Sequence, residues 1–197
     1  NDDVHRQALS LPPHYLLYLG GFDIRKNLRT LFKAFRIAYE AGAEVDLAIG
    51  GRLPAIDTAF APDPRRLARE TGVPADAVQF LGFVPEDAAA AVYRGAHTFI
   101  YPSIYEGFGL PPLEALSCGT PVVGSNTTSL PEVVGSAGVL LDPYDAEGMA
   151  GALIQLLNDD DFYRELRQHT REQAKRFTWQ RTATATLAAY HDAMKAG

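Results

Sequence analysis

Short runs of apolar residues recur along the chain and predict buried β-strands. The clearest run, YLLYL at residues 15–19, stops at Gly20 and Gly21, as a strand does where it enters a turn. Similar runs predict further strands at residues 45–49, 78–81, 97–101, 121–124 and 139–141.

Apolar residues spaced three and four positions apart predict helices between these strands. Residues 28–39 carry apolar side chains on one helical face, and Gly42 follows them as a helix end. The same reasoning places helices at residues 65–71, 86–94, 110–118, 131–134, 146–157, 160–176 and 179–194. Thr178 is the expected N-cap of the last helix.

Strands and helices alternate up to residue 141, which predicts parallel βαβ units. We therefore expect an α/β fold, a doubly wound Rossmann-like parallel sheet of about six strands with helices on both faces. No segment resembles a linker, so residues 1–197 are expected to form a single domain. The usual order of six such strands is 3-2-1-4-5-6, and ligands bind where the order reverses, between strands one and four. That topology brings the loops GGFDIRKN (residues 20–27) and PSIYEGFG (residues 102–109) together.

Composition limits the classes of partner. Of the 197 residues, 47% are hydrophobic, and the net charge is −6 without any block of Lys or Arg, which argues against nucleic acid or a membrane surface. Cys118 is the single cysteine and the five histidines lack ligand spacing, so neither a disulfide framework nor a metal site is expected. No apolar run approaches the roughly 18 residues of a membrane span.

The two loops also carry groups that suit an anion. Pro111 and Pro112 begin a helix, and backbone N–H groups before a helix point outward toward an anionic ligand. Arg25 and Lys26, in the opposite loop, can add positive charge. The outward N–H groups belong to Gly107, Phe108, Gly109 and Leu110. A diphosphate fits such a place.

Two glutamates bracket this loop and need a different partner. Glu106 and Glu114 repel an anion when ionised, but they accept hydrogen bonds from hydroxyl groups. A ligand that joins a diphosphate to many hydroxyls is a nucleotide sugar. Its ribose and its hexose can each occupy one glutamate.

The run FLGFVPEDAAAAVYRGAHTFIYPSIYEGFGLPPLEALSCGTPVVGSNTTSLPEVVG (residues 80–135) resembles the carboxy-terminal domain of retaining glycosyltransferases of family four, which have the GT-B fold. The resemblance covers nearly the whole chain, from YLGGFDIRKN to the tail FTWQRTATATLAAYHDAM. Its most specific feature is the E-x7-E pair, preceded by YPS, filled by GFGLPPL and followed by CGTPVV.

The resemblance implies a role for each matching residue. Glu114 matches the glutamate that accepts from the ribose, and Glu106 matches the catalytic glutamate beside the donor sugar. Lys26 matches the lysine on the diphosphate, and residues 107–110 match the backbone that meets sugar and phosphates. Val84 lies where the family's backbone meets the nucleobase.

One position departs from the family's pattern. Many members carry an arginine directly after the glycine that ends the first strand, where this chain has Gly21. Arg25 is then the candidate for the second positive charge on the donor.

The resemblance implies the donor-binding domain of a retaining glycosyltransferase that moves a hexose to an acceptor hydroxyl. The donor would be a nucleotide sugar such as GDP-mannose or UDP-glucose, and no metal or other cofactor is required. An acceptor glycan or lipid-linked sugar would bind through an amino-terminal domain that these residues do not include. The final helix, about residues 178–195, is expected to pack toward that domain. The expected location is cytoplasmic, at the inner face of a membrane where the other domain provides the contact.

Other functions fit the residues less well. A nicotinamide dehydrogenase needs G-x-G-x-x-G after the first strand, which GGFDIRKN does not supply. Two carboxylates also occur in glycosidases, but the glycine-rich turn and nearby cations favour a diphosphate over a neutral glycan. A GT-B epimerase gives no reason for the E-x7-E loop. A nucleotide-sugar-binding module without catalysis remains the alternative.

Overall fold

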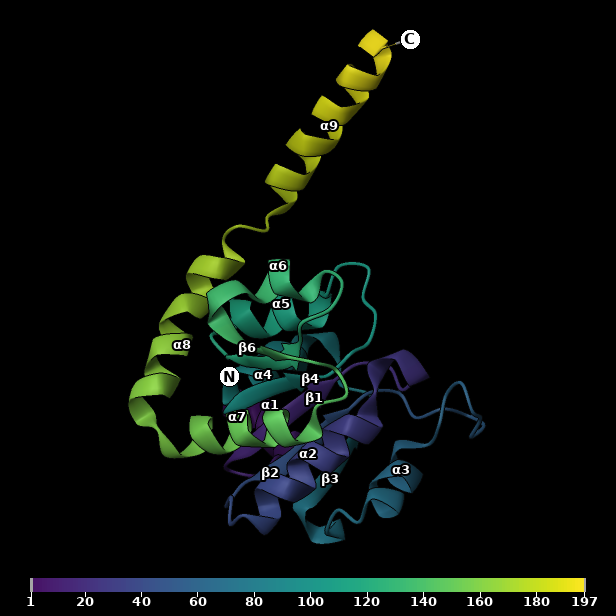
Figure 1. Cartoon of the computed structure of the whole chain (residues 1–197), viewed down its shortest axis with the longest axis vertical. Coiled ribbons are helices and arrows are strands. Elements are labelled where there is room, and N and C mark those ends of the chain that lie inside the picture. Colours follow the sequence, from purple (N-terminus) through teal and green to yellow (C-terminus); the bar gives the residue numbers. More distant parts are fainter. Residues whose placement is uncertain (1, 197) are drawn as a thin grey trace.

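The computed structural model describes residues 2–196 and contains a parallel sheet of six strands (Figure 1). These are β1 (Tyr15–Leu19), β2 (Asp46–Gly50), β3 (Val78–Gly82), β4 (Thr98–Tyr101), β5 (Val122–Ser125) and β6 (Gly138–Leu141). Their order, β3-β2-β1-β4-β5-β6, confirms the predicted doubly wound topology. β1 and β4 are neighbours, so the loops that follow them meet at one edge of the sheet.

Strand boundaries differ from the predicted ones by one residue at several ends, because pairing sets them. β2 begins at Asp46, which lies opposite Tyr15, and ends at Gly50, which lies opposite Leu19. Val45, predicted to begin this strand, is 6% exposed but lies outside it. Burial alone therefore does not mark where a strand begins.

The helices follow the predicted positions to within two residues, apart from one that the pattern does not reveal. They are α1 (Asp2–Ala8), α2 (Leu28–Glu40), α3 (Pro64–Thr71), α4 (Glu86–Gly95), α5 (Leu110–Ser117), α6 (Leu130–Val134), α7 (Ala146–Asn158), α8 (Asp160–Ala174) and α9 (Trp179–Ala196). α1 was missed because it buries no side chain; an ion pair of 2.7 Å between Asp2 and Arg94 ties it to α4. Short 3-10 turns are η1 (Ile24–Lys26), η2 (Ala75–Ala77) and η3 (Gly135–Ala137).

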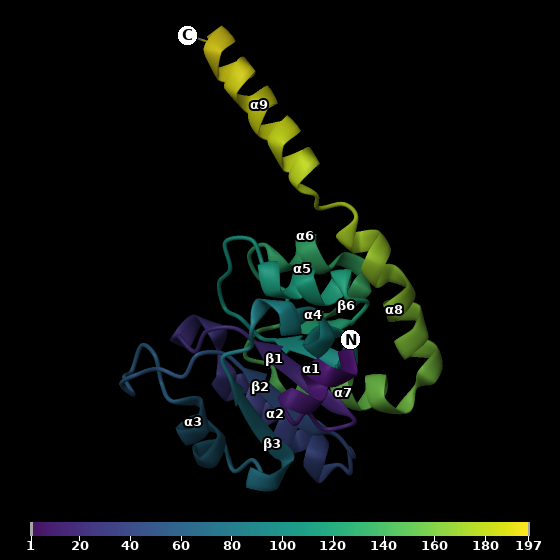
Figure 2. The same cartoon turned by 180° about the vertical axis from the view of Figure 1, so that it is seen from behind.

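Helices cover both faces of the sheet, as expected (Figures 1 and 2). α2 packs against α3 and α7 on one face, whereas α4 packs against α1 and α5 on the other. α8 contacts α5, α6 and α7 and so covers the β6 side of the sheet. Phe32 and Phe35 of α2 and Leu153 of α7 are fully buried, which places the apolar stripes of these helices in the core.

The last helix differs from the others because it projects away from the sheet in both views (Figures 1 and 2). Thr178 caps it as predicted, since its Oγ1 accepts from the N–H of Arg181 at 3.2 Å. Its large apolar side chains are exposed: Trp179 by 86%, Tyr190 by 64% and Met194 by 72%. Within residues 2–196, no helix combines the length and apolar character that crossing a bilayer requires.

Candidate functional site

The loops after β1 and β4 meet directly, as the strand order predicts. The N–H of Ile104 donates to the backbone carbonyl of Arg25 at 2.7 Å, across almost 80 residues of sequence. The side chain of Asn27 reinforces this junction by donating to the carbonyls of Pro102 at 3.2 Å and Pro143 at 2.6 Å. Asn27 adopts a left-handed conformation with φ 53°, which asparagine tolerates better than most residues.

The 3-10 turn η1 directs its two basic side chains to different places. Asp23 caps the turn by accepting from the N–H of Arg25, and its carboxylate also receives the Arg25 guanidinium at 2.7 Å. Hydrogen bonding to Asp23 raises the pKa of Arg25, whose side chain is 54% exposed. The next side chain, that of Lys26, is only 16% exposed and turns toward the β4 loop.

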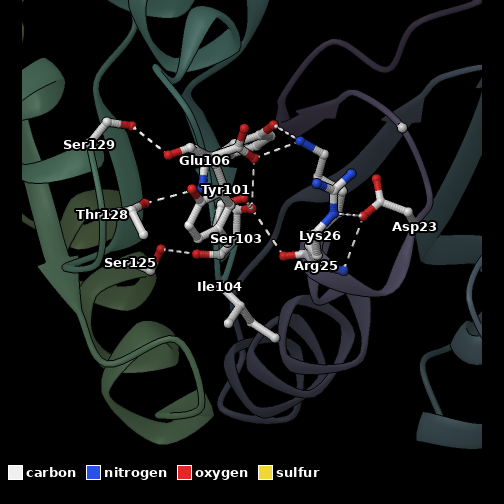
Figure 3. A network of polar contacts seen from close by, with 12 residues as sticks. Asp23, Arg25, Lys26, Tyr101, Ser103, Ile104, Glu106, Ser125, Thr128 and Ser129 are labelled. Carbon is white, nitrogen blue, oxygen red and sulfur yellow. Dashed lines mark hydrogen bonds and ion pairs between the residues drawn. The ribbon is translucent and has the colours of Figure 1, made fainter.

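Lys26 and Glu106 form the central contact of the site (Figure 3). The ammonium of Lys26 donates to Glu106 Oε1 at 2.6 Å and to the hydroxyl of Tyr101 at 2.9 Å. Only 12% of the Glu106 side chain is exposed, so both charges are largely shielded from water and hold each other in place.

Glu106 is fixed by its backbone as well as by its carboxylate (Figure 3). Its N–H donates to Thr128 Oγ1 at 3.1 Å, and its carbonyl accepts from Ser129 Oγ at 3.2 Å. The hydroxyl of Ser103 donates to the same Oε1 that Lys26 contacts, at 2.6 Å. The loop after β5 therefore supports the loop that carries Glu106.

Tyr101 forms the floor beneath the Lys26–Glu106 pair. Its ring stacks on Tyr18 with centroids 5.8 Å apart and on Phe99 at 5.5 Å, and the residue is 1% exposed. Burial, followed by the neighbouring Glu106 carboxylate, raises the pKa of Tyr101 far above its usual range. Its phenol therefore stays neutral and gives Lys26 a fixed acceptor.

Glu114 lies on α5 in a neighbouring groove. Its Oε2 accepts from the hydroxyl of Tyr93 at 2.9 Å, and burial, then Glu114 itself, raises the pKa of Tyr93. The Glu114 residue is exposed, so its carboxylate keeps acceptor capacity for a ligand. Glu114 therefore lies in more exposed surroundings than Glu106, whose side chain is only 12% exposed.

The groove beside Glu114 has a volume of about 430 Å³, within the usual range of small-molecule sites. Val84 lines it, and the guanidinium of Arg52 lies 5.4 Å from the centroid of the adjacent Phe83 ring. The full lining is Leu19, Gly20, Gly21, Gly51, Arg52, Phe83, Val84, Tyr93, Pro111 and Glu114.

The turn between the glutamates depends on a glycine in a left-handed conformation. Gly109 has φ 95°, and a Cβ there would lie 2.9 Å from Leu130 Cδ2, so only glycine fits without strain. Within residues 2–196, the N–H groups of residues 107–110 have no protein acceptor. Phe108 packs edge-on against Phe177 with centroids 5.8 Å apart and is 44% exposed, while Leu110 is 54% exposed.

The structure thus brings most of the predicted residues to one edge of the sheet, in two adjoining parts. Lys26 and Glu106 touch, and Val84 and Glu114 share the groove. Arg25 contributes its backbone to the junction, but its guanidinium binds Asp23 and does not reach Glu106. Among residues 2–196, no three His, Cys, Asp or Glu side chains are grouped to hold a metal ion.

Sequence reasoning missed four side chains that position the site: Asn27, Tyr93, Tyr101 and Ser103. Two of them were visible, since Tyr101 and Ser103 belong to the YPS motif that precedes the first glutamate. The motif identified the family's pattern but gave no reason for the hydroxyl groups in it. Tyr93 lies 21 residues before Glu114, so only the packed fold relates them.

Known proteins share this chain's sequence and fold. O-antigen chain mannosyltransferase B of Escherichia coli is 41% identical over 177 residues, 89% of this chain and 45% of that protein. Serotype-specific mannosyltransferase WbdA of Escherichia coli is 35% identical over 184 residues, 90% of this chain and 22% of that protein. The sucrose-phosphate synthase structure from Thermosynechococcus elongatus superposes with a TM-score of 0.80 at 31% identity, over 99% of this chain and 49% of that one.

The chain spans less than half the length of each of these proteins. The superposition agrees with the predicted GT-B half, and the resemblance drawn from the motifs is confirmed. A family model described as Glycosyl transferases group 1 matches residues 2–177, nearly the whole chain. With the E-x7-E loop, the sheet order and these relatives in agreement, the protein belongs to the family of group 1 glycosyl transferases.

Proposed function

We propose that this chain is the donor-binding half of a retaining glycosyltransferase that moves a hexose from a nucleotide diphosphate sugar to an acceptor hydroxyl. The observation that carries the proposal is the meeting of Lys26 and Glu106 at the ends of β1 and β4, beside the groove that holds Glu114. A cation suits the diphosphate and the carboxylates suit hydroxyl groups, which are the two kinds of group that a nucleotide sugar presents.

The names of the relatives favour mannose as the donor sugar. Two Escherichia coli relatives are named mannosyltransferases, which supports GDP-mannose, and UDP-glucose is the second choice. The nucleobase would lie against the backbone near Val84, where hydrogen bonds to N–H and C=O groups can read its edge.

Each part of the donor has a partner in this arrangement. The ribose hydroxyls donate to Glu114, and the diphosphate lies near Lys26 and the N–H groups of residues 107–110. An ammonium has three N–H donors, of which Tyr101 and Glu106 take two, so Lys26 keeps one for a phosphate oxygen. These groups supply the positive charge that a metal ion supplies elsewhere, so the proposal requires no metal.

Glu106 acts where charge develops. When the bond between the sugar's C1 and the diphosphate oxygen breaks, negative charge collects on the phosphate and the sugar becomes cation-like. Lys26 stabilises the first charge and the Glu106 carboxylate the second, from positions already fixed in the fold. Glu106 is assigned no covalent bond to the sugar.

The acceptor belongs to the part of the enzyme outside this chain. We propose that an amino-terminal domain binds an acceptor glycan or lipid-linked sugar and that α9 packs against it. The exposed apolar side chains of α9 support this, because a helix gains most of its stability from a packed apolar face. The proposed location is cytoplasmic, at the inner face of a membrane.

Calorimetric titration tests the donor site. The 197-residue chain is titrated with GDP, UDP, GDP-mannose and UDP-glucose, and then the variants Glu114→Gln and Glu106→Gln are compared. We expect Glu114→Gln to weaken nucleotide binding about tenfold, because glutamine is a poorer acceptor for ribose hydroxyls. Glu106→Gln should leave GDP or UDP binding within about twofold. The reverse pattern would exchange the two roles.

Transfer is tested in a protein that joins this chain to its amino-terminal half. Release of GDP from GDP-mannose, or of UDP from UDP-glucose, measures turnover even when water takes the sugar in place of an acceptor. Glu106→Gln should slow that release at least tenfold. Tight donor binding without any release would instead identify a non-catalytic binding module.

A further inference from the structure

One buried hydroxyl, that of Ser103, lies between the loops after β1 and β4 and contacts Glu106 (Figure 3). Ser103 follows the end of β4 and is 0% exposed. Its Oγ lies 2.6 Å from Glu106 Oε1, 3.0 Å from the carbonyl oxygen of Arg25 and 3.4 Å from that of Tyr105. Three acceptors therefore surround a side chain that has a single proton to give.

The carboxylate is the acceptor that this proton serves. The Arg25 carbonyl already receives the N–H of Ile104 at 2.7 Å, so it is satisfied without the serine. A hydrogen bond to an ionised carboxylate is shorter and stronger than one to a neutral carbonyl, and the Glu106 contact is the shortest of the three.

The serine is itself held from the far side. The hydroxyl of Ser125, in β5, donates to the Ser103 carbonyl, and Ser125 is also fully buried. Thr127 Oγ1 lies 3.4 Å from the same carbonyl oxygen. These contacts fix the backbone of Ser103 at the position from which its hydroxyl reaches Glu106.

Both donors to the Glu106 carboxylate reach the same oxygen. Lys26 and Ser103 contact Oε1 at 2.6 Å each, and the neutral Tyr101 phenol lies beside the same carboxylate, whose Oε2 has no direct contact of this kind within residues 2–196. The carboxylate is therefore oriented with Oε2 left to accept from a sugar hydroxyl.

We infer that Ser103 is a positioning residue for sugar transfer, which keeps the Glu106 carboxylate aimed at the sugar; this rests on the proposed role of Glu106. A donor's diphosphate pulls the Lys26 ammonium toward itself, which weakens one of the two restraints on Oε1. Ser103 carries no charge and is not attracted to phosphate, so its hydrogen bond maintains the geometry at that moment.

The kinetic test uses the protein that joins this chain to its amino-terminal half, with GDP-mannose and UDP-glucose as probes. Ser103→Ala should lower kcat for nucleotide release about tenfold, while KM and GDP binding change less than about twofold. Ser103→Cys keeps the volume but donates weakly and should behave like Ser103→Ala. Ser103→Thr keeps the hydroxyl and should recover most of the lost rate.

Thr170→Val is the control, because it removes a fully buried hydroxyl that bonds the carbonyl of Arg167 in its own helix, α8, away from Glu106. It should leave kcat within about twofold. A kcat loss in Thr170→Val equal to that in Ser103→Ala would show that loss of a buried hydroxyl acts only through folding and would overturn the inference.

A double variant separates the inference from the proposed function. If Ser103 acts through Glu106, Ser103→Ala should add no further loss to Glu106→Gln. If the rate losses of the two single variants instead multiply in the double variant, the inference is overturned, while the role of Glu106 stays intact. Full activity of Glu106→Gln alone would contradict the proposed function first.

A structural readout needs no turnover. In crystals of the 197-residue chain grown with GDP, Glu106 should occupy one rotamer with Ser103 present and several in Ser103→Ala. An unchanged single rotamer in the variant would overturn the inference.

Discussion

At the scale of single residues, two basic side chains that are adjacent in the sequence lie in different surroundings. Lys26 is largely buried and contacts Glu106, whereas Arg25 is mostly exposed and contacts Asp23. An exposed ion pair contributes little, but a shielded ammonium aimed at an anion site can contribute strongly. The two residues should therefore differ in what they do for a ligand.

Replacing each cation by alanine measures that difference. Lys26→Ala should weaken GDP or UDP binding about tenfold or more, because it removes a charge-assisted hydrogen bond. The affinity for the free nucleoside should change by less than about twofold. Arg25→Ala should weaken binding of the nucleotide diphosphate by no more than about threefold. Calorimetry checks both, and an equal loss for nucleoside and diphosphate in Lys26→Ala would assign the lysine a role in folding.

Residue patterns predicted the charged groups of the site better than the neutral ones. Glu106, Glu114 and Lys26 stand in motifs whose chemistry is evident from the residue type. Ser103 and Tyr101 belong to residue types that occur throughout any chain, so their role is apparent only from the 2.6 Å and 2.9 Å contacts. The pairing of Arg25 with Asp23 depends on local turn geometry that spacing does not reveal.

At the scale of elements, the turn that begins α5 depends on one glycine. Gly109→Ala should lower the free energy of unfolding by about 2 kcal/mol, because a left-handed residue with a Cβ costs about 1–2 kcal/mol and this Cβ also meets Leu130. Gly107→Ala is the control, since its Cβ would have no neighbour within 4 Å. Urea unfolding of both chains checks this, and similar losses at the two positions would contradict the strain.

A histidine directly before β4 packs against α8 and makes stability depend on pH. His97 stacks on Tyr163 with centroids 4.2 Å apart, and its Nε2 lies 3.0 Å from the carbonyl oxygen of Leu156. Burial lowers the pKa of His97 below its ordinary value, despite that hydrogen bond. The other charged or titratable groups that act on it are His14, Asp160 and Arg167.

Stability should therefore fall on acidification. Below the unfolded value of about 6.5, the unfolded chain takes up a proton that folded His97 still refuses, so unfolding becomes easier until the lower folded pKa is reached. Above about pH 7.5 the residue is neutral in both states and contributes no slope. Urea unfolding at several pH values should show a shallower slope in His97→Gln; an unchanged slope would assign the effect to other groups.

Elements with buried apolar faces were predictable, and those without them were not. The hydrophobic runs revealed the six strands, and the usual topology of a doubly wound sheet supplied their order. α1 escaped prediction because an ion pair at its surface, not a buried face, attaches it to α4. Strand ends shifted because backbone pairing determines them.

At the scale of the whole molecule, α9 is the element that the rest of the chain does not explain. Trp179, in α9, is the single tryptophan of the sequence and is 86% exposed. The chain's fluorescence should therefore have the emission of indole in water and change little on unfolding. Joining the amino-terminal half should shift the emission to shorter wavelength, and an unchanged spectrum would contradict packing of α9 against that half.

The proposed donor site lies where β1 and β4 end, and a nucleotide diphosphate should bind there. A crystal structure of the 197-residue chain with GDP, or with UDP if calorimetry shows tighter binding, tests this most directly. We expect the diphosphate at hydrogen-bond distance from Lys26 and from N–H groups of residues 107–110, with the ribose on Glu114 and the base beside Val84. A nucleotide bound elsewhere, or in this groove with its ribose remote from Glu114 and its phosphates remote from Lys26, would contradict the proposed donor site.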